Sequence, residues 1–499
     1  MNLLTLLDMV VGGHGDRVAF GDAERGLTGE QLRDQAYAGA RHVLSAQART
    51  VVFMGENGPG FPLALFAAAA AGVPLLPLNY RLAPHHLIEA VRQQEKVLLI
   101  STDRSLSSLD NVVESLSPSE WIQLCAGLPA AVEPPVQPGT DDIALLLMTS
   151  GTTAAPKSAV LRHRHITAYV LTTVEFGGSD PDEAVVVSVP PYHIAAVANL
   201  LSNLYTGRRI VYLDKFSARS WLETAAAERV THAMLVPTML ARIVEELETG
   251  QAPMPVTLRS LSYGGAKMAP SVLGRALAAL PDVGFVNGYG LTETSSSIAV
   301  LGPEEHREAL ASGDPLVRAR LGSVGRPLPS VAIEVRGPDG TPCAPGEIGL
   351  IFVKGPQVAG EYRESGPQTD TDGWFATRDE GYVDADGYVF VRGRADDTII
   401  RGGENIAPAE IESVLELHDS VADVAVTGLA DDEWGQRIGA FVVLREGARA
   451  TEEELQEFVR ERLRSAKTPD AVYFVDELPH SPTGKILRRE LINQAMTRR

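Results

Sequence analysis

The segment Thr149–Ser158, TSGTTAAPKS, combines small hydroxylated residues with a glycine and a lysine, directly after an apolar run. Small residues let a backbone approach a phosphate closely, and N–H groups, hydroxyls and a lysine are donors to a polyanion. The segment nearly matches a Walker A loop, with Gly151, Lys157 and Ser158 in register, but Pro156 stands where the second glycine belongs. Proline lacks an N–H and has a fixed φ, which disfavours a true P-loop. The sequence therefore predicts another kind of phosphate-binding loop, with a plain polar turn as the alternative.

A second segment, NGYGLTET at Asn287–Thr294, follows a predicted short strand at 284–286 and places a tyrosine between two glycines. The ring of Tyr289 could face a flat base. Thr292 and Glu293 could serve a phosphate and its Mg²⁺, because that ion prefers oxygen ligands. In isolation the segment is also typical of a glycine-rich turn with a core tyrosine.

Two more segments could supply ligand contacts. In Trp374–Tyr382, Asp379 stands at the predicted entry of a strand, where its carboxylate could accept both hydroxyls of a ribose or simply cap a turn. In Pro482–Arg488, the glycine before Lys485 lets the loop reach into a site, where the ammonium could stabilise developing negative charge. The alternative for this last segment is a solvated basic tail.

Together and in this order, the segments resemble the adenylate-forming superfamily of acyl-CoA synthetases, nonribosomal-peptide adenylation domains and beetle luciferases. The resemblance runs from about Val51 to Arg489. Besides TSGTTAAPKS, NGYGLTET and PTGK at 482–485, it rests on PPYH at 190–193, YGGAKM at 263–268 and GWFATRDEGYVDADGYVFVRGRADDTIIRGGENIAPAEIE at 373–412.

The resemblance implies a role for each matching residue. Those implied to hold the phosphates are Thr149, Ser150, Gly151, Thr152, Thr153 and Lys157. Those implied around the adenine are Gly264, Gly265, Ala266 and Tyr289, and Asn287, Gly288 and Gly290 are implied to bind the cofactor as well. Asp379 and Arg394 are implied to bind the ribose, and Thr149 and Glu293 to bind Mg²⁺. Thr292 is implied to contact the α-phosphate, and Lys485 to contact the attacking carboxylate. Gly402, Gly403 and Glu404 are implied to line the path of the thiol arm.

The implied activity is an AMP-forming acyl-CoA ligase that uses ATP, CoA and Mg²⁺. A carboxylate attacks the α-phosphate of ATP, and a thiol then displaces AMP from the acyl-adenylate. The family's small C-terminal domain rotates between these steps, and Asp396 matches its hinge. Loading of a carrier protein is the alternative of the same class, although no carrier domain is fused here. A non-catalytic nucleotide-binding homologue is the alternative of another class.

The substrate pocket is expected beside His193, which matches a histidine at the pocket mouth of acyl- and aryl-CoA synthetases. The stretch Tyr192–Leu201 contains no acidic residue that could hold a substrate ammonium. The sequence therefore predicts a non-amino carboxylic acid, fatty or aryl, and Ala195 and Ala196 leave the pocket unblocked. A packed core histidine is the alternative for His193.

Two departures from the family pattern stand out. Ala154 and Ser158 replace glycines of the phosphate loop, which costs backbone freedom if either position needs a positive φ. The family's TGD is Thr377-Arg378-Asp379 here, and the sequence offers no physical reason for Arg378.

The elements that must position these residues are typical of an α/β fold. Buried apolar strands alternate with helical segments, which predicts parallel sheets covered on both faces. The predicted strands are 50–54, 96–100, 143–148, 184–189, 209–213 and 233–236. A small antiparallel module follows, with strands at 331–336 and 348–354 and a hairpin turning at 384–387.

The last hundred residues predict a small mobile α+β domain. Its expected elements are a helix at 408–417, strands at 421–429 and 437–445, a helix opened by the capping box at Thr451–Glu454, and a terminal helix at 485–496. We expect an N-terminal domain of stacked α/β sheets with the β-module at 1–395 and the mobile domain at 396–499.

Composition limits the partners. The 499 residues are 44% hydrophobic and carry a net charge of −20, which is typical of a globular enzyme and disfavours nucleic acid as a partner. Two distant cysteines indicate no disulfide framework. No targeting signal is visible, and the uncharged stretch between Glu56 and Arg81 is interrupted by proline and glycine, so a buried helix at 63–71 and a strand at 73–78 are expected instead of a membrane span. We expect a cytoplasmic protein and leave a homodimer open.

Overall fold

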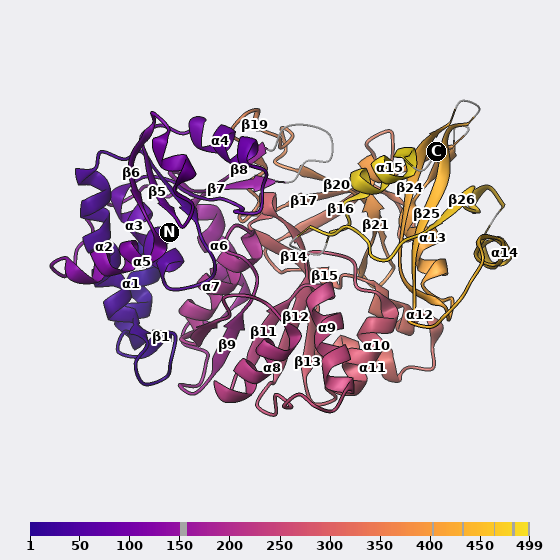
Figure 1. Ribbon diagram of the computed structural model, residues 1–499, viewed down its shortest axis with the longest axis horizontal. Coiled ribbons are helices and arrows are strands. Elements are labelled where there is room, and N and C mark those ends of the chain that lie inside the picture. The colour runs from indigo at the N-terminus through magenta and orange to yellow at the C-terminus, as the bar shows by residue number, and fades with distance from the viewer. Residues whose placement is uncertain (150–156, 402–403, 432–433, 464, 482–484, 498–499) are drawn as a thin grey trace.

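The computed structural model describes residues 1–149, 157–401, 404–431, 434–463, 465–481 and 485–497. Within these residues the strands form four sheets. Figure 1 shows two large sheets in the N-terminal part, a smaller sheet beside them and a C-terminal sheet at the opposite end of the molecule. The α/β class expected from the sequence is confirmed.

One large sheet carries the strand that leads into the predicted phosphate loop. Its strands are β3 (Thr50–Met54), β4 (Leu75–Pro77), β5 (Val97–Ser101), β6 (Val112–Leu116), β7 (Ile143–Thr149), β8 (Lys157–Arg162), β18 (Glu361–Tyr362) and β19 (Gly366–Pro367). They lie in the order β19-β18-β8-β7-β4-β3-β5-β6, parallel from β7 to β6. The β7–β8 pair is antiparallel, and β18 joins from more than two hundred residues later in the chain.

The other large sheet carries the predicted adenine site. Its strands are β1 (Val18–Phe20), β2 (Leu27–Thr28), β9 (Ala184–Val187), β10 (Arg209–Tyr212), β11 (His232–Leu235), β12 (Ser260–Gly264), β13 (Gly284–Leu291), β14 (Ser296–Leu301) and β15 (Arg326–Pro327). The order is β15-β14-β13-β12-β11-β9-β10-β1-β2, parallel from β13 to β1.

Helices cover both sheets and join them. They are α1 (Leu3–His14), α2 (Gly29–Ser45), α3 (Gly60–Ala71), α4 (Pro84–Arg92), α5 (Pro118–Gly127), α6 (His163–Thr173), α7 (Ile194–Thr206), α8 (Ala218–Ala227), α9 (Pro237–Glu248), α10 (Pro270–Ala279), α11 (Pro303–Ala311) and α12 (Pro315–Ala319), with the 3₁₀ turns η1 (Arg104–Ser108), η2 (Thr292–Thr294) and η3 (Arg320–Gly322). A continuous apolar core contains side chains of both sheets, such as Val51 and Val185, together with Leu7 and Leu201 from helices between them. Because this core is shared, the two sheets form one rigid platform.

The alanine-rich stretch forms the buried helix α3, as expected. All of its residues are buried, and it packs against α2 and α5. Gly72 ends it with a left-handed backbone (φ +68°), which glycine adopts without steric cost. Among the described residues, none of the helices has the length and apolar character needed to span a bilayer.

The small antiparallel module and the C-terminal unit follow the sequence expectation closely. The module contains β16 (Ala332–Arg336), β17 (Gly349–Lys354), β20 (Phe375–Val383) and β21 (Val389–Arg394), followed by η4 (Ala395–Asp397). The C-terminal unit contains β22 (Ile399–Arg401), β23 (Glu404–Ile406), α13 (Pro408–Leu415), β24 (Val421–Asp431), β25 (Gly435–Leu444), α14 (Glu452–Arg462), η5 (Ser465–Lys467), β26 (Ala471–Phe474) and α15 (Arg488–Thr497).

The C-terminal unit has a core of its own. Ile411, Val424, Ile438 and Leu455 belong to an apolar cluster made only of residues after β21. The predicted capping box of α14 is present, because Thr451 and Glu454 each bond the other's backbone N–H. A separate core supports an independent folding unit, while the boundary at 395/396 and its mobility stay predictions.

Three expectations about elements are wrong. The strand before the tyrosine does not stop at Val286: β13 continues to Leu291, because its glycine-rich end pairs with β14. Asp379 lies inside β20 rather than at a strand entry. The terminal helix begins at Arg488, since Lys485 is bonded through its carbonyl oxygen to the Ser481 N–H (2.7 Å) in a turn.

The close contact of β12 and β13 generates a stability prediction. A Cβ at Gly264 would lie 2.3 Å from the carbonyl oxygen of Gly288, whereas a Cβ at Gly274, exposed on α10, would meet nothing within 4 Å. Gly264→Ala should therefore lower the apparent melting temperature, at a cost of about 1–3 kcal/mol. Gly274→Ala should raise it slightly through helix propensity. Calorimetry of both variants checks this, and a Gly264→Ala protein as stable as the wild type would contradict it.

Candidate active site

The adenine side of the predicted site lies at the carboxyl ends of β12 and β13, where ligands commonly bind in parallel α/β sheets. Gly264 pairs with Gly288 across the two strands, and the absence of side chains there lets the backbones approach closely. Gly265 continues with a left-handed backbone (φ +83°). The structure thus brings YGGA and NGYG together, as the resemblance implies, with Tyr289 next to the paired glycines.

A buried carboxylate links this sheet to the small module. The Tyr289 hydroxyl donates to Asp379 Oδ2 at 2.6 Å, and Arg394 Nη1 donates to Oδ1 at 3.2 Å. Asp379 is 5% exposed, and this desolvation raises its pKa, opposed by Arg394, the Tyr289 hydrogen bond and Lys485. Burial lowers the pKa of Arg394, but Asp379, Glu293 and Asp396 outweigh it and leave that pKa raised.

Backbone pairing fixes the geometry of this carboxylate. Asp379 and Arg394 are direct partners in the β20–β21 ladder. The same guanidinium also donates to the Thr377 carbonyl at 3.3 Å. Two predicted ribose contacts are therefore held side by side by strand register, one residue before the turn η4.

Glu293 and Lys157 meet through a residue that the sequence motifs do not include. The Tyr362 hydroxyl donates to Glu293 Oε1, and Lys157 Nζ lies 5.4 Å from the centre of the Tyr362 ring. Tyr362 reaches this place because β18 pairs with β8. Burial and the nearby Glu293 carboxylate raise the pKa of the Tyr362 hydroxyl, so it stays a neutral donor.

The turn that carries Thr292 and Glu293 is tightly held. The Glu293 carbonyl accepts the N–H groups of Ala359 (2.8 Å) and Gly360 (3.1 Å), and the Gln357 amide donates to the Thr294 carbonyl at 3.0 Å. Directly after the turn, Ser295 and Ser296 have positive φ values of 55° and 115°. Such backbone strain persists only where surrounding bonds impose it, and it is concentrated at functional sites.

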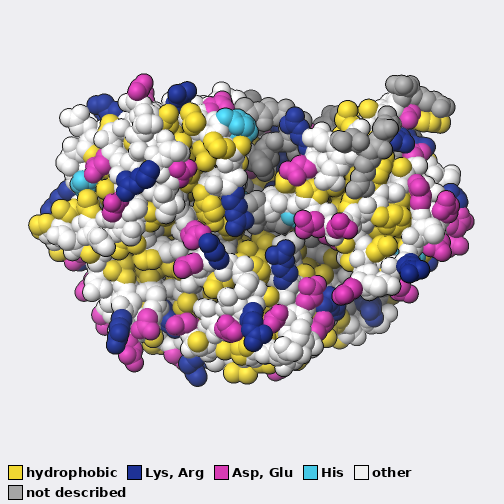
Figure 2. Space-filling view, in the orientation of Figure 1, with side chains coloured by type: hydrophobic (Ala, Val, Ile, Leu, Met, Phe, Trp, Pro, Cys, Tyr) yellow, Lys and Arg dark blue, Asp and Glu magenta, His cyan; other side chains and the backbone are white. Residues whose placement is uncertain are grey.

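Lys485 faces this same group of charges from the C-terminal unit. Its side chain retains access to solvent, but the surrounding protein lowers its pKa through desolvation, and Arg394 lowers it further. Asp379, Glu293 and Asp397 act in the opposite direction. Figure 2 shows a dip in the upper outline of the surface beside the C-terminal lobe.

His193 caps the N-terminus of α7 and packs against the Tyr192 ring (4.6 Å between centroids). Burial lowers the pKa of His193 to about 3, with Lys485 and Arg81 contributing, so the imidazole is neutral at pH 7. Its Nε2 atom is buried and has no hydrogen-bond partner among the described residues. A neutral ring with an unsatisfied nitrogen fits a substrate contact better than a packed core role.

The predicted magnesium ligands fit the chemistry of that ion in part. With Oε1 occupied by Tyr362, the carboxylate of Glu293 still offers Oε2, and the Thr149 hydroxyl lies at the end of β7. Mg²⁺ characteristically uses one or two carboxylates together with substrate phosphates and water. No cluster of three or more His, Cys, Asp or Glu side chains suited to a metal occurs in the described part of the chain.

Several predicted residues cannot be placed. Ser150, Gly151, Thr152, Thr153 and Ala154, together with Gly402 and Gly403, lie outside the described residues. Glu404 begins β23 and Ala266 follows Gly265 in the loop after β12. The Asn287 amide donates to the Ser323 carbonyl at 3.2 Å, which gives this residue a structural bond besides any ligand contact.

The backbone conformation differs between Ser158 and Arg378, which both depart from the family pattern. Ser158 lies in β8 without a positive φ, and its N–H donates to Glu364 (3.0 Å), so the missing glycine costs nothing there. Arg378 does occupy a left-handed backbone, with φ +64°. The expected strain is thus absent at Ser158, while Ala154 lies outside the described residues.

Three residues near the site are absent from the sequence motifs: Tyr362, Glu364 and Arg81. Tyr362 and Glu364 come from the β18 segment, whose sequence GEYRES carries no chemical signal. Arg81 lies 5.6 Å from the centre of the Tyr80 ring, and Tyr80 packs edge-on against Tyr192. The pairing of β18 with β8 reveals Tyr362 and Glu364, and the packing of aromatic rings reveals Arg81.

Comparison with known proteins identifies the family. The protein-family model described as AMP-binding enzyme matches residues 7–363, and the AMP-binding enzyme C-terminal domain matches residues 410–485. The chain therefore belongs to the AMP-binding enzymes, and its resemblance to the adenylate-forming superfamily is confirmed. The interval between the two matches contains the predicted boundary but does not fix it.

Individual relatives cover nearly the whole chain. A feruloyl-CoA synthase of Amycolatopsis sp. is 36% identical over 88% of both chains. A fatty acid–[acyl-carrier-protein] ligase, ScoC, of Streptomyces coeruleorubidus is 34% identical over 94% of this chain and 91% of its own. The solved o-succinylbenzoate coenzyme A synthetase of Bacillus subtilis, in complex with ATP and magnesium ion, is 29% identical with a TM-score of 0.83, covering 97% of this chain and 98% of that one.

The Asp379 geometry generates a binding prediction. Asp379→Asn keeps the shape but removes the charge that Arg394 and Tyr289 hold in place. AMP affinity should fall by about 10- to 100-fold, the value of hydrogen bonds to a charged group. Asp386→Asn is the matched control, because Asp386 is an exposed carboxylate paired with Arg320 at the end of the same hairpin.

Isothermal titration calorimetry with AMP measures both variants. The Asp386→Asn protein should bind AMP as the wild type does. Unchanged AMP affinity in the Asp379→Asn protein would contradict the ribose assignment.

Proposed function

We propose that this AMP-binding enzyme is an AMP-forming ligase that joins a non-amino carboxylic acid to CoA through an acyl-adenylate. ATP, CoA and the acid are its substrates, and Mg²⁺, held at Glu293 and Thr149, neutralises phosphate charge when bound. The activity belongs in the cytoplasm, where ATP and CoA are available.

A single observation carries the proposal: Lys485 of the C-terminal unit faces Asp379, Arg394 and Glu293, which come from three different elements of the N-terminal part. A ribose carboxylate, a metal carboxylate and a mobile ammonium are the groups that adenylate formation needs. Their convergence argues against a homologue that only binds nucleotide.

In the first half-reaction, an oxygen of the substrate carboxylate attacks the α-phosphorus of ATP. A new O–P bond forms, and the bond from this phosphorus to the bridging oxygen of pyrophosphate breaks. Lys485 would hold the attacking carboxylate against the phosphate, Thr292 would contact the α-phosphate, and Lys157 would face the leaving phosphates. This chemistry consists mostly of positioning and charge neutralisation.

In the second half-reaction, the CoA sulfur attacks the acyl carbon, the proton of the thiol is released, and AMP leaves with the electron pair of the acyl–oxygen bond. We place this step after a rotation of residues 396–499 about Asp396. The rotation would withdraw Lys485 and bring in the segment Arg401–Asn405. Gly402 and Gly403, which have no side chains beyond hydrogen, suit close passage of a slender pantetheine arm.

The substrate class follows from the pocket side of α7. Between Tyr192 and Leu201 no acidic residue could pair with a substrate ammonium, and His193 is neutral. An unpaired buried ammonium is strongly disfavoured. Relatives named for ferulic and 2-succinylbenzoic acids support an acid without an amino group. The relative named as an acyl-carrier-protein ligase supports a carrier protein as the second candidate acceptor.

A panel of acids tests this function. Aryl, hydroxycinnamic and fatty acids are incubated with ATP, Mg²⁺ and CoA, and AMP and thioester are quantified. At least one acid should give both products, and 3-phenylpropanoic acid should exceed phenylalanine by about 10²–10³-fold in pyrophosphate exchange. Acyl-adenylate without thioester, rescued by a carrier protein, would favour the second acceptor. Exchange with the amino acid alone would refute the substrate class.

The role of Lys485 gives a sharper prediction. Lys485→Ala should slow adenylation by about 10²–10³-fold, the effect of a lost electrostatic contact in the transition state. Thioester formation from supplied acyl-adenylate should change far less, because Lys485 is withdrawn in that step. Stopped-flow pyrophosphate release and thioester formation measure the two rates, and equal losses in both would refute the rotation.

The same residue predicts a pH dependence. The lowered pKa of Lys485 means that its ammonium is present at neutral pH and is lost as pH rises through a value below 10.5. Adenylation, measured without CoA so that its thiol does not titrate, should therefore decline on the alkaline side before pH 10.5. Lys485→Arg should abolish this decline because a guanidinium stays protonated. An identical alkaline limb in Lys485→Arg would assign it to another group.

A further inference from the structure

Arg378 has an unusual backbone for an arginine. Its φ of +64° lies in the left-handed region, which disfavours residues other than glycine, asparagine and aspartate. The side chain is 55% exposed, so apolar burial gives no reason to hold it there. Backbone strain of this kind persists where surrounding contacts sustain it, and the guanidinium of Arg378 makes one such interaction.

That interaction is with the first residue of the predicted C-terminal domain. Arg378 Nη1 lies 3.8 Å from Asp396 Oδ2. The arginine is on β20, beside Asp379, whereas the aspartate is in η4 after the end of β21. The ion pair therefore spans the predicted domain boundary at the residue about which the domain is expected to turn.

We propose that Arg378 is a positioning residue that stabilises, through Asp396, the arrangement of residues 396–499 in which Lys485 faces the site. The inference rests on the proposed two-step function and on the predicted boundary. A change of φ at Asp396 moves its Cβ relative to the N-terminal part, so a rotation about that bond would re-aim the carboxylate and break this pair.

Other contacts across the boundary belong to the same arrangement. The Thr398 hydroxyl, two residues after Asp396, donates to Glu380 Oε2 at 3.4 Å, and further contacts lie farther along the chain. Lys267 Nζ lies 2.8 Å from Ser413 Oγ and 3.8 Å from Glu416, and Arg392 Nη2 lies 2.7 Å from Glu410 Oε2. These contacts engage α13 and the residue after it, at a distance along the chain from the turning point. Arg378 differs because its partner is the turning residue itself, and because it keeps a strained backbone to reach that partner.

The effect of the pair is small and suited to a balanced equilibrium. An exposed ion pair shifts an equilibrium by about two- to fivefold. A two-state arrangement near balance responds to a shift of that size, whereas a strongly biased one does not. Arg378 thus tunes how much of the enzyme is ready for adenylation without locking it there.

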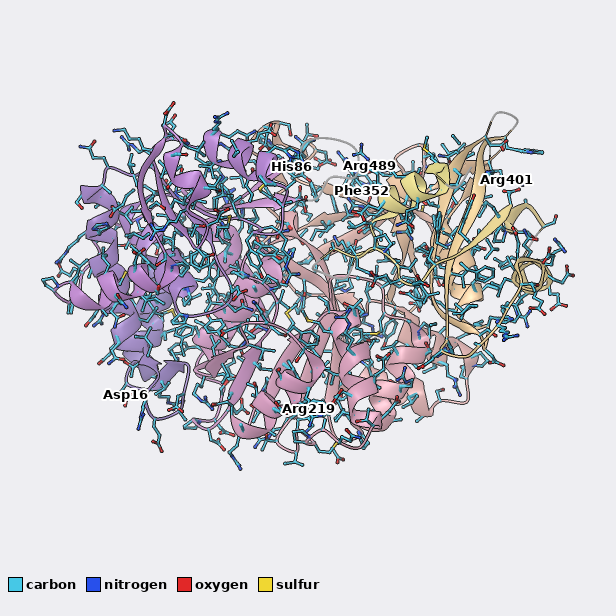
Figure 3. The ribbon with its side chains drawn as sticks, viewed as in Figure 1. Asp16, His86, Arg219, Phe352, Arg401 and Arg489 are labelled. Carbon is cyan, nitrogen blue, oxygen red and sulfur yellow. The ribbon has the colours of Figure 1, made fainter. Side chains whose placement is uncertain are left out.

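The test measures the two arrangements without any substrate. Spin labels are placed on Arg219→Cys, at the outer face of α8 (Figure 3), and on Glu453→Cys, exposed on α14, with Cys343→Ser to remove the accessible native thiol. Distances between the labels come from pulsed electron spin resonance of the full chain. The wild type should give two distances between the labels. The distance that matches the structure described here is assigned to the arrangement in which Lys485 faces the site.

Matched variants separate charge from strain. Arg378→Asn removes the charge but tolerates the left-handed backbone, and Arg378→Gly removes both charge and strain. Both should reduce the ratio of the Lys485-facing arrangement to the other by about two- to fivefold. The reversed pair, Arg378→Asp with Asp396→Arg, should restore the ratio, and high salt should reduce the difference between wild type and variants.

Three results would overturn the proposal: an unchanged ratio in Arg378→Asn, a single distance in all proteins, or a reversed pair that fails to restore the ratio. Failure of the proposed function is separate, because inactivity across the acid panel leaves these distances untouched. If both proposals hold, Arg378→Gly also slows adenylation and accelerates thioester formation from supplied acyl-adenylate by the same two- to fivefold factor.

Discussion

The buried carboxylate of Asp379 is the interaction on which the arrangement of the site depends. Its charge is held by a hydroxyl from the large sheet and a guanidinium from the adjacent strand of the small module. Removing a charge from water is costly unless donors replace the lost hydration. The large sheet and the β-module are therefore held together at the site by one carboxylate. Burial nevertheless raises the pKa of Asp379, against the opposing effects of Arg394, the Tyr289 hydrogen bond and Lys485.

Cationic side chains gather at the site, although the chain as a whole is strongly acidic. The chain carries a net charge of −20, and Figure 2 shows acidic side chains over much of the visible surface. At the site, Lys157, Arg394 and Lys485 gather around Glu293 and Asp379. These cations favour a polyanion at the site, because low-dielectric walls strengthen nearby charges while distant charges are screened.

Backbone strain and close approach mark the same region. The β12–β13 contact requires glycine at position 264, the turn after Glu293 places two serines at positive φ, and Arg378 holds a left-handed backbone beside Asp379. Each is a local cost sustained by the stable platform of two sheets that share a core. Three of the six described non-glycine residues with positive φ, Ser295, Ser296 and Arg378, lie in this region, and the others, Gln47, Lys96 and Arg229, lie in connections elsewhere.

The sequence by itself determined the family, the α/β class and the two-part organisation, because these depend on local patterns. Apolar runs set the strands, capping chemistry set α14, and the order of the motifs identified the adenylate-forming enzymes. It also named Gly264, Tyr289, Glu293, Asp379, Arg394 and Lys485 as site residues, since each stands in a short motif. Their convergence is visible in the structure, while their roles toward ligands stay predictions.

Tertiary structure alone decided what depends on contacts between distant segments. Tyr362 joins Glu293 because β18 pairs with β8, a register that the sequence GEYRES does not signal. Backbone dihedrals show that Arg378, and not Ser158, adopts the positive φ that favours glycine. A sequence motif does not encode these angles. The pKa values of His193 and Lys485 follow from burial and from charges on other elements, so they too exist only in the folded chain.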